Sequence, residues 1–217
     1  MREKMNVLFI MTDQQRADHL SCMGNPVLKT PNLDQIAKDG VRFTRAYCSN
    51  PMCMPNRATI FTGKYPSVHG VRCNGINLNP KIPTITQKLS ENGYHTISIG
   101  KLHFQFSVPP YSRKDRSEEC VLNWISGKGS SGFPIPYYGF DEVEITVGHG
   151  DGIVGHYLEW LQEKAPEYIE YVKKRALNAF KSVYHDTTLP HELYQTSFIT
   201  ERTISFLERY SRGDYKN

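Results

Sequence analysis

The chain has 217 residues, 39% hydrophobic and 22% charged, and 26 Lys and Arg residues against 22 Asp and Glu residues give it a formal net charge of +4. This composition is typical of a folded globular protein and excludes a disordered, collagen-like or coiled-coil chain. The basic residues are scattered, and the basic group at residues 173–175 is predicted to be a solvated helix face, so we expect no nucleic-acid partner. No stretch approaches the roughly 20 apolar residues of a membrane span, so no membrane partner is expected.

Cysteine usage and the N-terminal residues both favour a cytoplasmic location. The five cysteines are an odd number, widely spaced, with no C-x-x-C pair and no zinc-type spacing to histidines. A reducing compartment is therefore expected. The apolar run at residues 7–11 is too short for the hydrophobic region of a signal peptide, and no small-residue cleavage site follows it.

The first elements in chain order are predicted to be a strand, a helix and a second strand. Residues 6–11 form a continuous apolar run, which indicates a buried central strand. Residues 30–40 carry helix signals: Thr30 can cap, Pro31 takes the first helical position and Gly40 ends the segment. Residues 41–47 then alternate in polarity like a strand.

The same succession returns further along the chain. Residues 84–93 are predicted to form a helix capped by Thr84, and residues 94–99 a strand. Helices that lead into strands predict an α/β fold with a largely parallel sheet, in which ligands bind beyond the carboxyl ends of the strands. The pairs Asp13–Gln14 and Lys101–x–His103 both follow predicted strands, which is the first indication of a site.

The remainder of the chain is predicted to be an insertion followed by helices. Residues 107–139 are rich in Pro, Gly and Ser but keep aromatic residues, which favours an insertion over a linker. Helices are expected at residues 153–162 and 167–182, and a last helical stripe at 199–210. Residues 148–152 are interpreted as a glycine-rich loop that is not preceded by a buried strand and that could line a pocket.

One stretch carries a pattern suited to chemistry. Cys53 stands beside a turn fixed by Pro55, Asn56 can cap a following helix, and Arg57 comes four residues after the cysteine. A cysteine near a helix N-terminus and an arginine lies in a positive field, which lowers a thiol pKa and attracts anions. On these residues alone, a small buried cysteine beside a helix cap is the favoured interpretation.

The wider pattern resembles the type I sulfatases. The signature is C-x-P-x-R followed by T-G-K, and it stands among four further segments in the family's order: residues 6–14, 30–34, 65–71 and 100–103. The resemblance implies a three-layer αβα sandwich around a mostly parallel mixed sheet, as in the alkaline-phosphatase superfamily. It also implies that residues 1–217 are the N-terminal portion of one catalytic domain, with the insertion inside it and the fold incomplete at the C-terminus.

The resemblance further implies a cofactor chemistry. Cys53 would be converted to formylglycine by a formylglycine-generating enzyme, and one hydroxyl of the hydrated aldehyde would attack the sulfur of a sulfate ester. The sulfated intermediate would then collapse, which releases sulfate and restores the aldehyde. A divalent cation would be held by Asp13, Gln14 and residue 53; calcium is the family expectation, and oxygen ligands also suit magnesium or manganese.

Four further residues receive roles from the resemblance. Arg57 would hold the formylglycine hydroxyl, Lys101 would bind a sulfate oxygen, His103 would contact the second hydroxyl or transfer a proton, and Asn74 would lie near the substrate. The alternatives from the residues alone are a solvated lysine and a structural histidine. His69 is predicted to be part of the scaffold.

Two departures from the family pattern keep a second function open. Asn56 stands where the signature has Ser, and Gln14 stands where the second metal ligand is often Asp. Gln14 and Asn74 also resemble phosphonate monoester hydrolases, relatives with the same nucleophile. The leading prediction is a sulfuric ester hydrolase that acts on a sulfate-ester small molecule or a sulfated glycan. The alternatives are a phosphonate monoester or phosphodiester hydrolase, or a non-catalytic fragment that lacks the C-terminal metal ligands.

Overall fold

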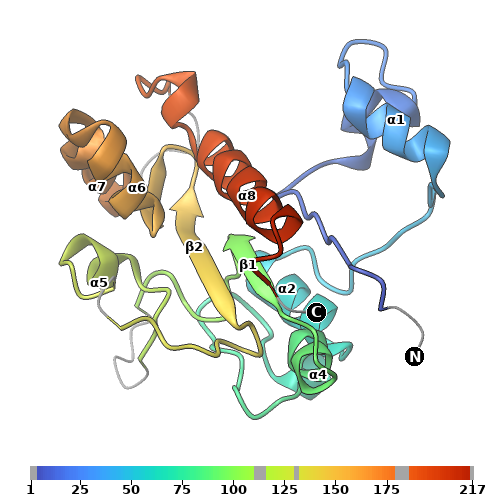
Figure 1. Ribbon diagram of the computed structural model, residues 1–217, viewed down its shortest axis with the longest axis horizontal. Coiled ribbons are helices and arrows are strands. Elements are labelled where there is room, and N and C mark those ends of the chain that lie inside the picture. Colours follow the sequence, from blue (N-terminus) through green and yellow to red (C-terminus); the bar gives the residue numbers. More distant parts are fainter. Residues whose placement is uncertain (1–3, 110–115, 130–131, 179–185, 216–217) are drawn as a thin grey trace. The chain divides into compact units, whose positions relative to one another are not determined.

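The computed structural model describes residues 4–109, 116–129, 132–178 and 186–215 (Figure 1). Its contacts divide the chain into two compact units, Met1–Tyr47 and Cys48–Asn217. Each unit is described by itself. The predicted assignment of the whole chain to one catalytic domain therefore stays a prediction.

The N-terminal unit is built around one helix, α1 (Pro31–Asp39), with the short 3-10 helices η1 (Ala17–His19) and η2 (Ser21–Met23). The predicted helix is confirmed, with Pro31 in its first turn and Gly40 after its last residue. Asp34 binds η2 to this helix, because its carboxylate accepts hydrogen bonds from the Ser21 hydroxyl at 2.6 Å and the Cys22 N–H at 2.8 Å.

Both strands predicted in this unit are wrong. Residues 6–11 and 41–47 do not form strands, and the apolar side chains of the first run are largely exposed, with Phe9 at 60% and Ile10 at 73%. A strand needs a hydrogen-bonded neighbour, and the described residues of this unit supply helices and loops only. An apolar run or an alternating pattern is therefore insufficient to define a strand without a neighbouring strand.

The second unit contains a three-stranded mixed sheet. The strands are β1 (Ile97–Gly100), β2 (Glu142–His149) and β3 (Gly152–Gly155), in the order β1-β2-β3. β1 and β2 run parallel, with Gly100 paired to Ile145, whereas β2 and β3 run antiparallel. The prediction of an α/β fold with a mixed sheet is confirmed.

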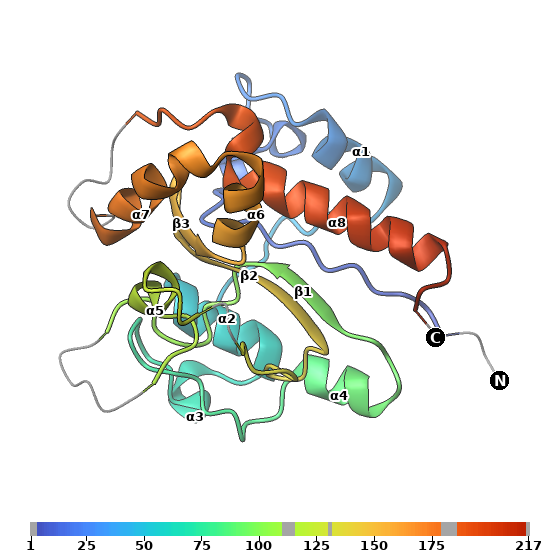
Figure 2. The ribbon, with the colours of Figure 1, turned by 60° about the vertical axis from the view of Figure 1, so that its left-hand side comes forward.

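Helices cover both faces of this sheet (Figure 2). α6 (Tyr157–Lys164) and α8 (Gln195–Ser211) lie on one side, and α2 (Cys53–Thr62), α4 (Ile85–Glu91) and α5 (Val121–Ile125) lie on the other. The remaining helices are α3 (Pro66–His69), η3 (Pro166–Tyr168), α7 (Ile169–Asn178) and η4 (His191–Leu193). None of the helices in the described ranges has the length and apolar character that a bilayer crossing requires.

The helix predictions in this unit hold in part. α4 is capped as expected, since the Thr84 hydroxyl accepts the Gln87 N–H at 3.2 Å, and the predicted strand after it begins only at Ile97. The helix expected from residue 153 is wrong in its first part, because Ile153 and Val154 belong to the buried strand β3 and α6 begins later. α8 confirms the last predicted helix. α7 confirms the helix predicted at residues 167–182 over its described part, and residues 179–182 lie outside the described ranges.

The apolar core of this unit lies on both faces of the sheet. Ile145, Val154, Leu161 and Val172 are almost fully buried, and β3 is buried along its whole length. A strand buried on both faces reads as a continuous apolar run, which is why Ile153 and Val154 resemble the start of a helix in the sequence. β2 lies between β1 and β3, and the carboxyl ends of the parallel strands β1 and β2 lie at the same edge of the sheet.

Candidate active site

Cys53 is the first residue of α2, where the helix N-terminus is positive. The residue is partly buried, and Met52 before it has extended backbone angles. The next amide, that of Met54, donates to the Asn74 side-chain oxygen at 3.1 Å, so Asn74 satisfies one of the free N–H groups of the helix end. Pro55 fits in the first turn because a proline there removes no helical hydrogen bond. The predicted helix is confirmed, but Asn56 does not cap it, because the helix already begins at Cys53 and Asn56 lies within its first turn.

Arg57 ties this helix to the end of β1. It lies one turn after Cys53, its side chain is buried, and its Nη1 donates a hydrogen bond to the main-chain carbonyl of Lys101. A guanidinium has five N–H donors in one plane, so this bond is compatible with a second contact toward residue 53. The contact with the formylglycine hydroxyl that the resemblance implies for Arg57 stays a prediction.

Lys101 and His149 meet at the carboxyl edge of the sheet. Lys101 follows β1 and His149 ends β2, and because these strands are parallel their carboxyl ends share one edge. The Lys101 Nζ lies 2.6 Å from the His149 Nε2. A protonated lysine can only donate, so His149 accepts on Nε2 and carries its proton on Nδ1.

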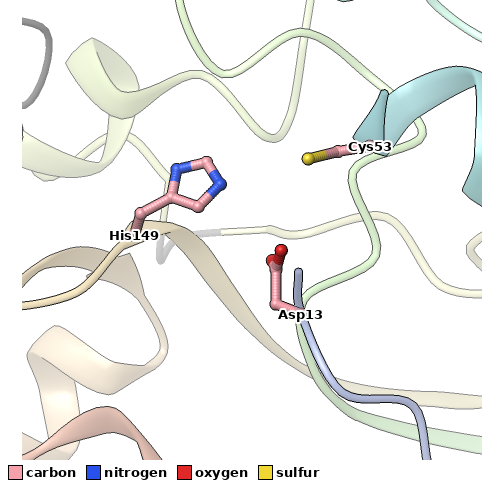
Figure 3. A group of neighbouring side chains, drawn as sticks. All are labelled: Asp13, Cys53 and His149. Atoms are coloured by element: carbon pink, nitrogen blue, oxygen red, sulfur yellow. The ribbon is translucent and has the colours of Figure 1, made fainter. Parts of the chain in front are cut away.

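His149 also lies close to the candidate nucleophile. Figure 3 shows the Cys53 thiol at the start of its helix and the His149 ring at the end of its strand, and the Cys53 Sγ lies within 4.8 Å of a His149 ring nitrogen. His149 is 48 positions from Lys101 and 96 positions from Cys53 in the sequence, yet the fold brings all three residues close together. Within the second unit, the arrangement brings a cysteine, a lysine, a histidine and a buried arginine together.

The glycine-rich segment at residues 148–152 is part of this site, and the prediction that no buried strand precedes it is wrong. β2 precedes it, with Ile145, Thr146 and Val147 buried. Gly148 has φ +112°, and a Cβ there would lie 2.4 Å from the Gly152 carbonyl oxygen, so only glycine allows the tight turn that presents His149. The β-branched run Ile145–Thr146–Val147 is the signal that could have identified the strand.

His103 is placed by its backbone. The residue is buried, has φ +59°, and its N–H donates to the Glu119 carboxylate at 2.6 Å. Lys101, His103, Glu119, Thr146 and His149 line one small recess. The structure thus brings Lys101, His103 and His149 together, whereas their chemical roles stay predictions.

Glu119 is a buried acid that the sequence did not identify. It lies in the predicted insertion, and burial raises the pKa of its carboxyl from 4.5 to about 7, opposed by hydrogen bonds from Tyr137 and from three main-chain amides. Within the insertion, α5 is the one helix in the described residues, and residues 110–115 and 130–131 lie outside them.

His69 lies in the scaffold, as predicted. Its Nδ1 accepts the Val71 N–H at 3.1 Å, and its Nε2 contacts the Thr59 hydroxyl at the same distance. These contacts suit the neutral ring, and burial lowers the pKa of His69. Its side chain therefore joins α2 to α3.

Asp13 and Gln14, the predicted metal ligands, belong to the N-terminal unit. Both residues are exposed, and Gln14 has φ +50°, a left-handed backbone that a glutamine adopts at a cost. Their role as ligands stays a prediction. Asn74 is exposed and its oxygen serves the helix end, so the substrate contact predicted for it is likewise untested.

The chemistry available at this edge of the sheet suits an anion. A helix N-terminus, Lys101 and Arg57 all contribute positive potential, and a reactive side chain, Cys53, lies among them. Such a site can bind a sulfate or phosphate group and present a nucleophile to it.

Known proteins resemble this chain in sequence. The chain is 42% identical over 208 residues to an arylsulfatase of Clostridium perfringens, which covers 95% of this chain and 40% of the relative. It is 35% identical over 144 residues to an ulvan-active sulfatase of Formosa agariphila, over 65% of this chain and 28% of the relative. The chain thus spans well under half the length of these curated relatives.

The fold has solved counterparts as well. The phosphonate monoester hydrolase of Agrobacterium radiobacter matches 94% of this chain and 37% of its own length, with a TM-score of 0.63 at 24% identity. This likeness confirms the predicted fold class, an α/β fold around a mixed sheet. The family model named Sulfatase matches residues 5–133. The chain belongs to the sulfatase family.

Proposed function

We propose that the protein hydrolyses sulfate esters, with residue 53 in its formylglycine form as the nucleophile. The observation that carries this proposal is the meeting of Lys101 and His149 beside Cys53, at the N-terminus of α2. The nearby family members are named sulfatases, and one is named for activity on ulvan. A sulfate ester of a small molecule or of a glycan is therefore the proposed substrate class.

The residues present fit a formylglycine and a hard divalent cation. Cys53 is partly exposed at the start of its helix, so a maturation enzyme can reach it. Asp13 offers a carboxylate and Gln14 an amide oxygen, which are ligands that calcium or magnesium prefers. Asp13, Gln14 and residue 53 would hold the cation, and we propose calcium. When bound, these groups supply a nucleophilic hydroxyl and neutralise negative charge on the sulfate.

The residues of the chain would then share the remaining tasks. Lys101 donates to a sulfate oxygen, and its contact with His149 holds the ammonium group at the carboxyl edge of the sheet. His149 lies close enough to residue 53 to contact the bound ester. Arg57, buried and anchored on the Lys101 carbonyl, adds positive charge that favours the anionic form of the nucleophile.

A phosphonate monoester or phosphodiester substrate is the second candidate. Gln14 and Asn74 favour it by their residue types, and the solved phosphonate hydrolase shares the fold. The deciding assay compares kcat/KM for an activated aryl sulfate and an aryl phosphonate monoester, with the complete protein matured by a formylglycine-generating enzyme. We expect the sulfate ester to be preferred at least tenfold, and a reversed preference would replace the sulfatase proposal by the second candidate. The cytoplasmic location stays a proposal that fractionation of cells can test.

A further inference from the structure

The carboxylate of Glu119 binds the turn that follows β1. Its oxygens accept the main-chain N–H groups of His103 at 2.6 Å, Phe104 at 2.8 Å and Gln105 at 3.2 Å. A fourth hydrogen bond comes from the Tyr137 hydroxyl at 2.8 Å. Glu119 is only 1% exposed, so these four donors take the place of water around its carboxylate.

The turn has a backbone conformation that calls for such an anchor. His103 has φ +59°, a backbone angle that residues other than glycine rarely adopt because it costs conformational energy. Successive N–H groups that converge on one anion form a concave site that favours negative charge. The carboxylate therefore stabilises the turn in the conformation that His103 adopts.

The anchor lies directly beside the candidate active site. Glu119 lines the same recess as Lys101, His103 and His149, and the turn that it binds begins two residues after Lys101. The Arg57 guanidinium binds the Lys101 carbonyl, just before the same turn in the chain. The direction in which the Lys101 and His103 side chains leave the strand end thus depends on two buried charged groups.

The segment that carries Glu119 is itself held against this turn. The Glu118 N–H donates to the Gln105 side-chain oxygen at 2.7 Å, and the Val121 N–H donates to the Ser107 carbonyl at 2.9 Å. The Ser117 hydroxyl donates to the Phe106 carbonyl at 2.6 Å. These three hydrogen bonds hold the segment around Glu119, which belongs to the predicted insertion, against the turn.

We propose that Glu119 is a positioning residue of the active site, whose carboxylate holds residues 103–105 so that Lys101 and His103 face the recess beside His149. This inference rests on the proposed function for its effect on turnover, but its effect on the turn can be measured without turnover. The groups that face Glu119 are Tyr137 and Tyr138 from its own segment and, across the recess, Lys101, His103 and His149. Experiments at pH 8 keep the carboxyl ionised.

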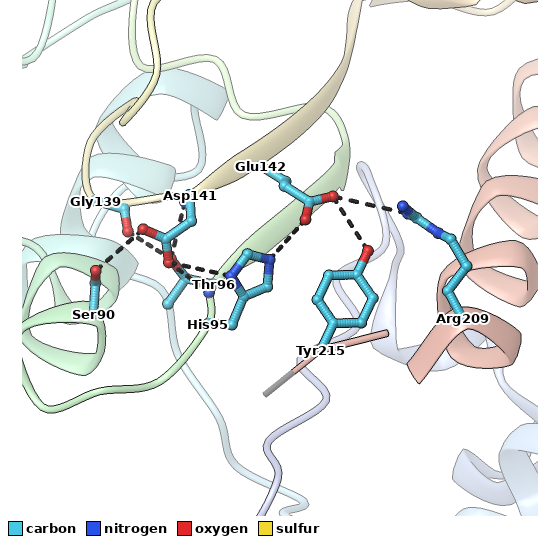
Figure 4. A network of polar contacts seen from close by, with 8 residues as sticks. All are labelled: Ser90, His95, Thr96, Gly139, Asp141, Glu142, Arg209 and Tyr215. Atoms are coloured by element: carbon cyan, nitrogen blue, oxygen red, sulfur yellow. Dashed lines mark hydrogen bonds and ion pairs between the residues drawn. The ribbon is translucent and has the colours of Figure 1, made fainter. Parts of the chain in front are cut away.

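The test uses Glu119→Gln, which keeps the size of the side chain but replaces one oxygen by an N–H donor. At least one main-chain N–H then meets a donor and the turn loses its fixed conformation. The matched control is Asp141→Asn. Asp141 accepts the Thr96 N–H and hydroxyl, both at 2.8 Å, at the opposite end of β1 (Figure 4). Both variants remove a carboxylate that binds main chain, but only one lies beside the active site.

Turnover of an aryl sulfate by the complete matured protein is the first measurement. We expect Glu119→Gln to lower kcat by about 10- to 100-fold with KM changed less than about threefold, because reacting groups displaced by about 1 Å lose that much. Asp141→Asn should keep kcat within about twofold, since no active-site group contacts it. If both variants are destabilised alike and both keep kcat within twofold, Glu119 is only structural and the proposal is overturned.

Hydrogen exchange of the amides at residues 103–105 is the second measurement. We expect protection in the wild type and in Asp141→Asn, and its selective loss in Glu119→Gln. Unprotected amides in the wild type would overturn the proposal. A wild type without turnover but with this exchange pattern would instead refute the proposed function alone.

If Glu119→Gln does not fold, Tyr137→Phe replaces it. That variant removes one of the four hydrogen bonds and should lower kcat and amide protection by about tenfold, the effect of losing one hydrogen bond to a charged carboxylate. No change in either quantity would overturn the proposal.

Discussion

The buried carboxyl of Glu119 makes the stability of the protein depend on pH in a defined direction. Its pKa rises from 4.5 in the unfolded chain to about 7 in the fold, because burial disfavours the charged form. Between these values the native state holds a proton that the unfolded state has lost. The stabilisation is therefore complete below about pH 4.5 and disappears as the pH rises through about 7.

The size of this effect follows from the same two values. A rise from 4.5 to about 7, at about 1.4 kcal/mol for each pH unit, gives about 3 kcal/mol. His69 and His156 act in the opposite direction, because burial lowers the pKa of each, and stability from them is lost as the pH falls. Glu119→Gln keeps both histidines, so subtracting its curve from the wild-type curve isolates the carboxyl.

Urea unfolding at pH values from 4.5 to 8 measures this difference. We expect the unfolding free energy of the wild type, relative to Glu119→Gln, to fall by about 3 kcal/mol across this range. Asp141→Asn provides the control. Burial raises the pKa of the Asp141 carboxyl, but hydrogen bonds from Thr96 and Ser90 outweigh it and lower the pKa overall, so stability from this carboxyl is lost as the pH falls. A difference that is flat, or that increases with pH, would refute the reasoning, since the four hydrogen bonds would then outweigh burial.

Three further predictions concern the site directly. Lys101→Ala should lower kcat for sulfate esters by about 100- to 1,000-fold, the range for one preorganised charge contact, and a rate within twofold of the wild type would reject its role. Asn74→Ala should lower the unfolding free energy by about 1 kcal/mol through loss of the contact with the Met54 N–H, and an unchanged denaturation midpoint would contradict this. Residues 1–217 alone should not hydrolyse an aryl sulfate in millimolar calcium, since Asp13, Gln14 and residue 53 supply fewer than the roughly six oxygens that calcium takes. Measurable turnover by this chain would show that it holds a whole site.

The local parts of the site could be predicted from the sequence. Pro55 and Asn56 predict a helix beside Cys53, and the structure has one there, although it begins at Cys53 and not after Asn56. Lys101 follows a strand that its own residues define. Each of these inferences needed only neighbouring residues, and apart from that helix boundary each agrees with the structure.

The residues that the sequence did not identify are brought to the site by distant pairing. His149 reaches Lys101 because β2 pairs with β1 in parallel, a relation that no local pattern in residues 142–149 reveals. Glu119 reaches residues 103–105 because the described residues around it hydrogen-bond to residues 105–107, a pairing between segments that no local pattern reveals. The segment at residues 6–11 shows the converse: its apolar pattern predicts a strand, yet its own unit offers it no neighbouring strand in the described residues.

The most direct test of the proposed function is the mass of the peptide that contains residue 53, measured together with turnover. Protein made with a formylglycine-generating enzyme should yield this peptide about 18 Da lighter than the thiol form, reactive toward hydrazides. Its turnover of an aryl sulfate should rise in proportion to the converted fraction, and Cys53→Ala should have none. Full activity from protein with an unmodified Cys53 thiol, or activity that survives Cys53→Ala, would contradict the account.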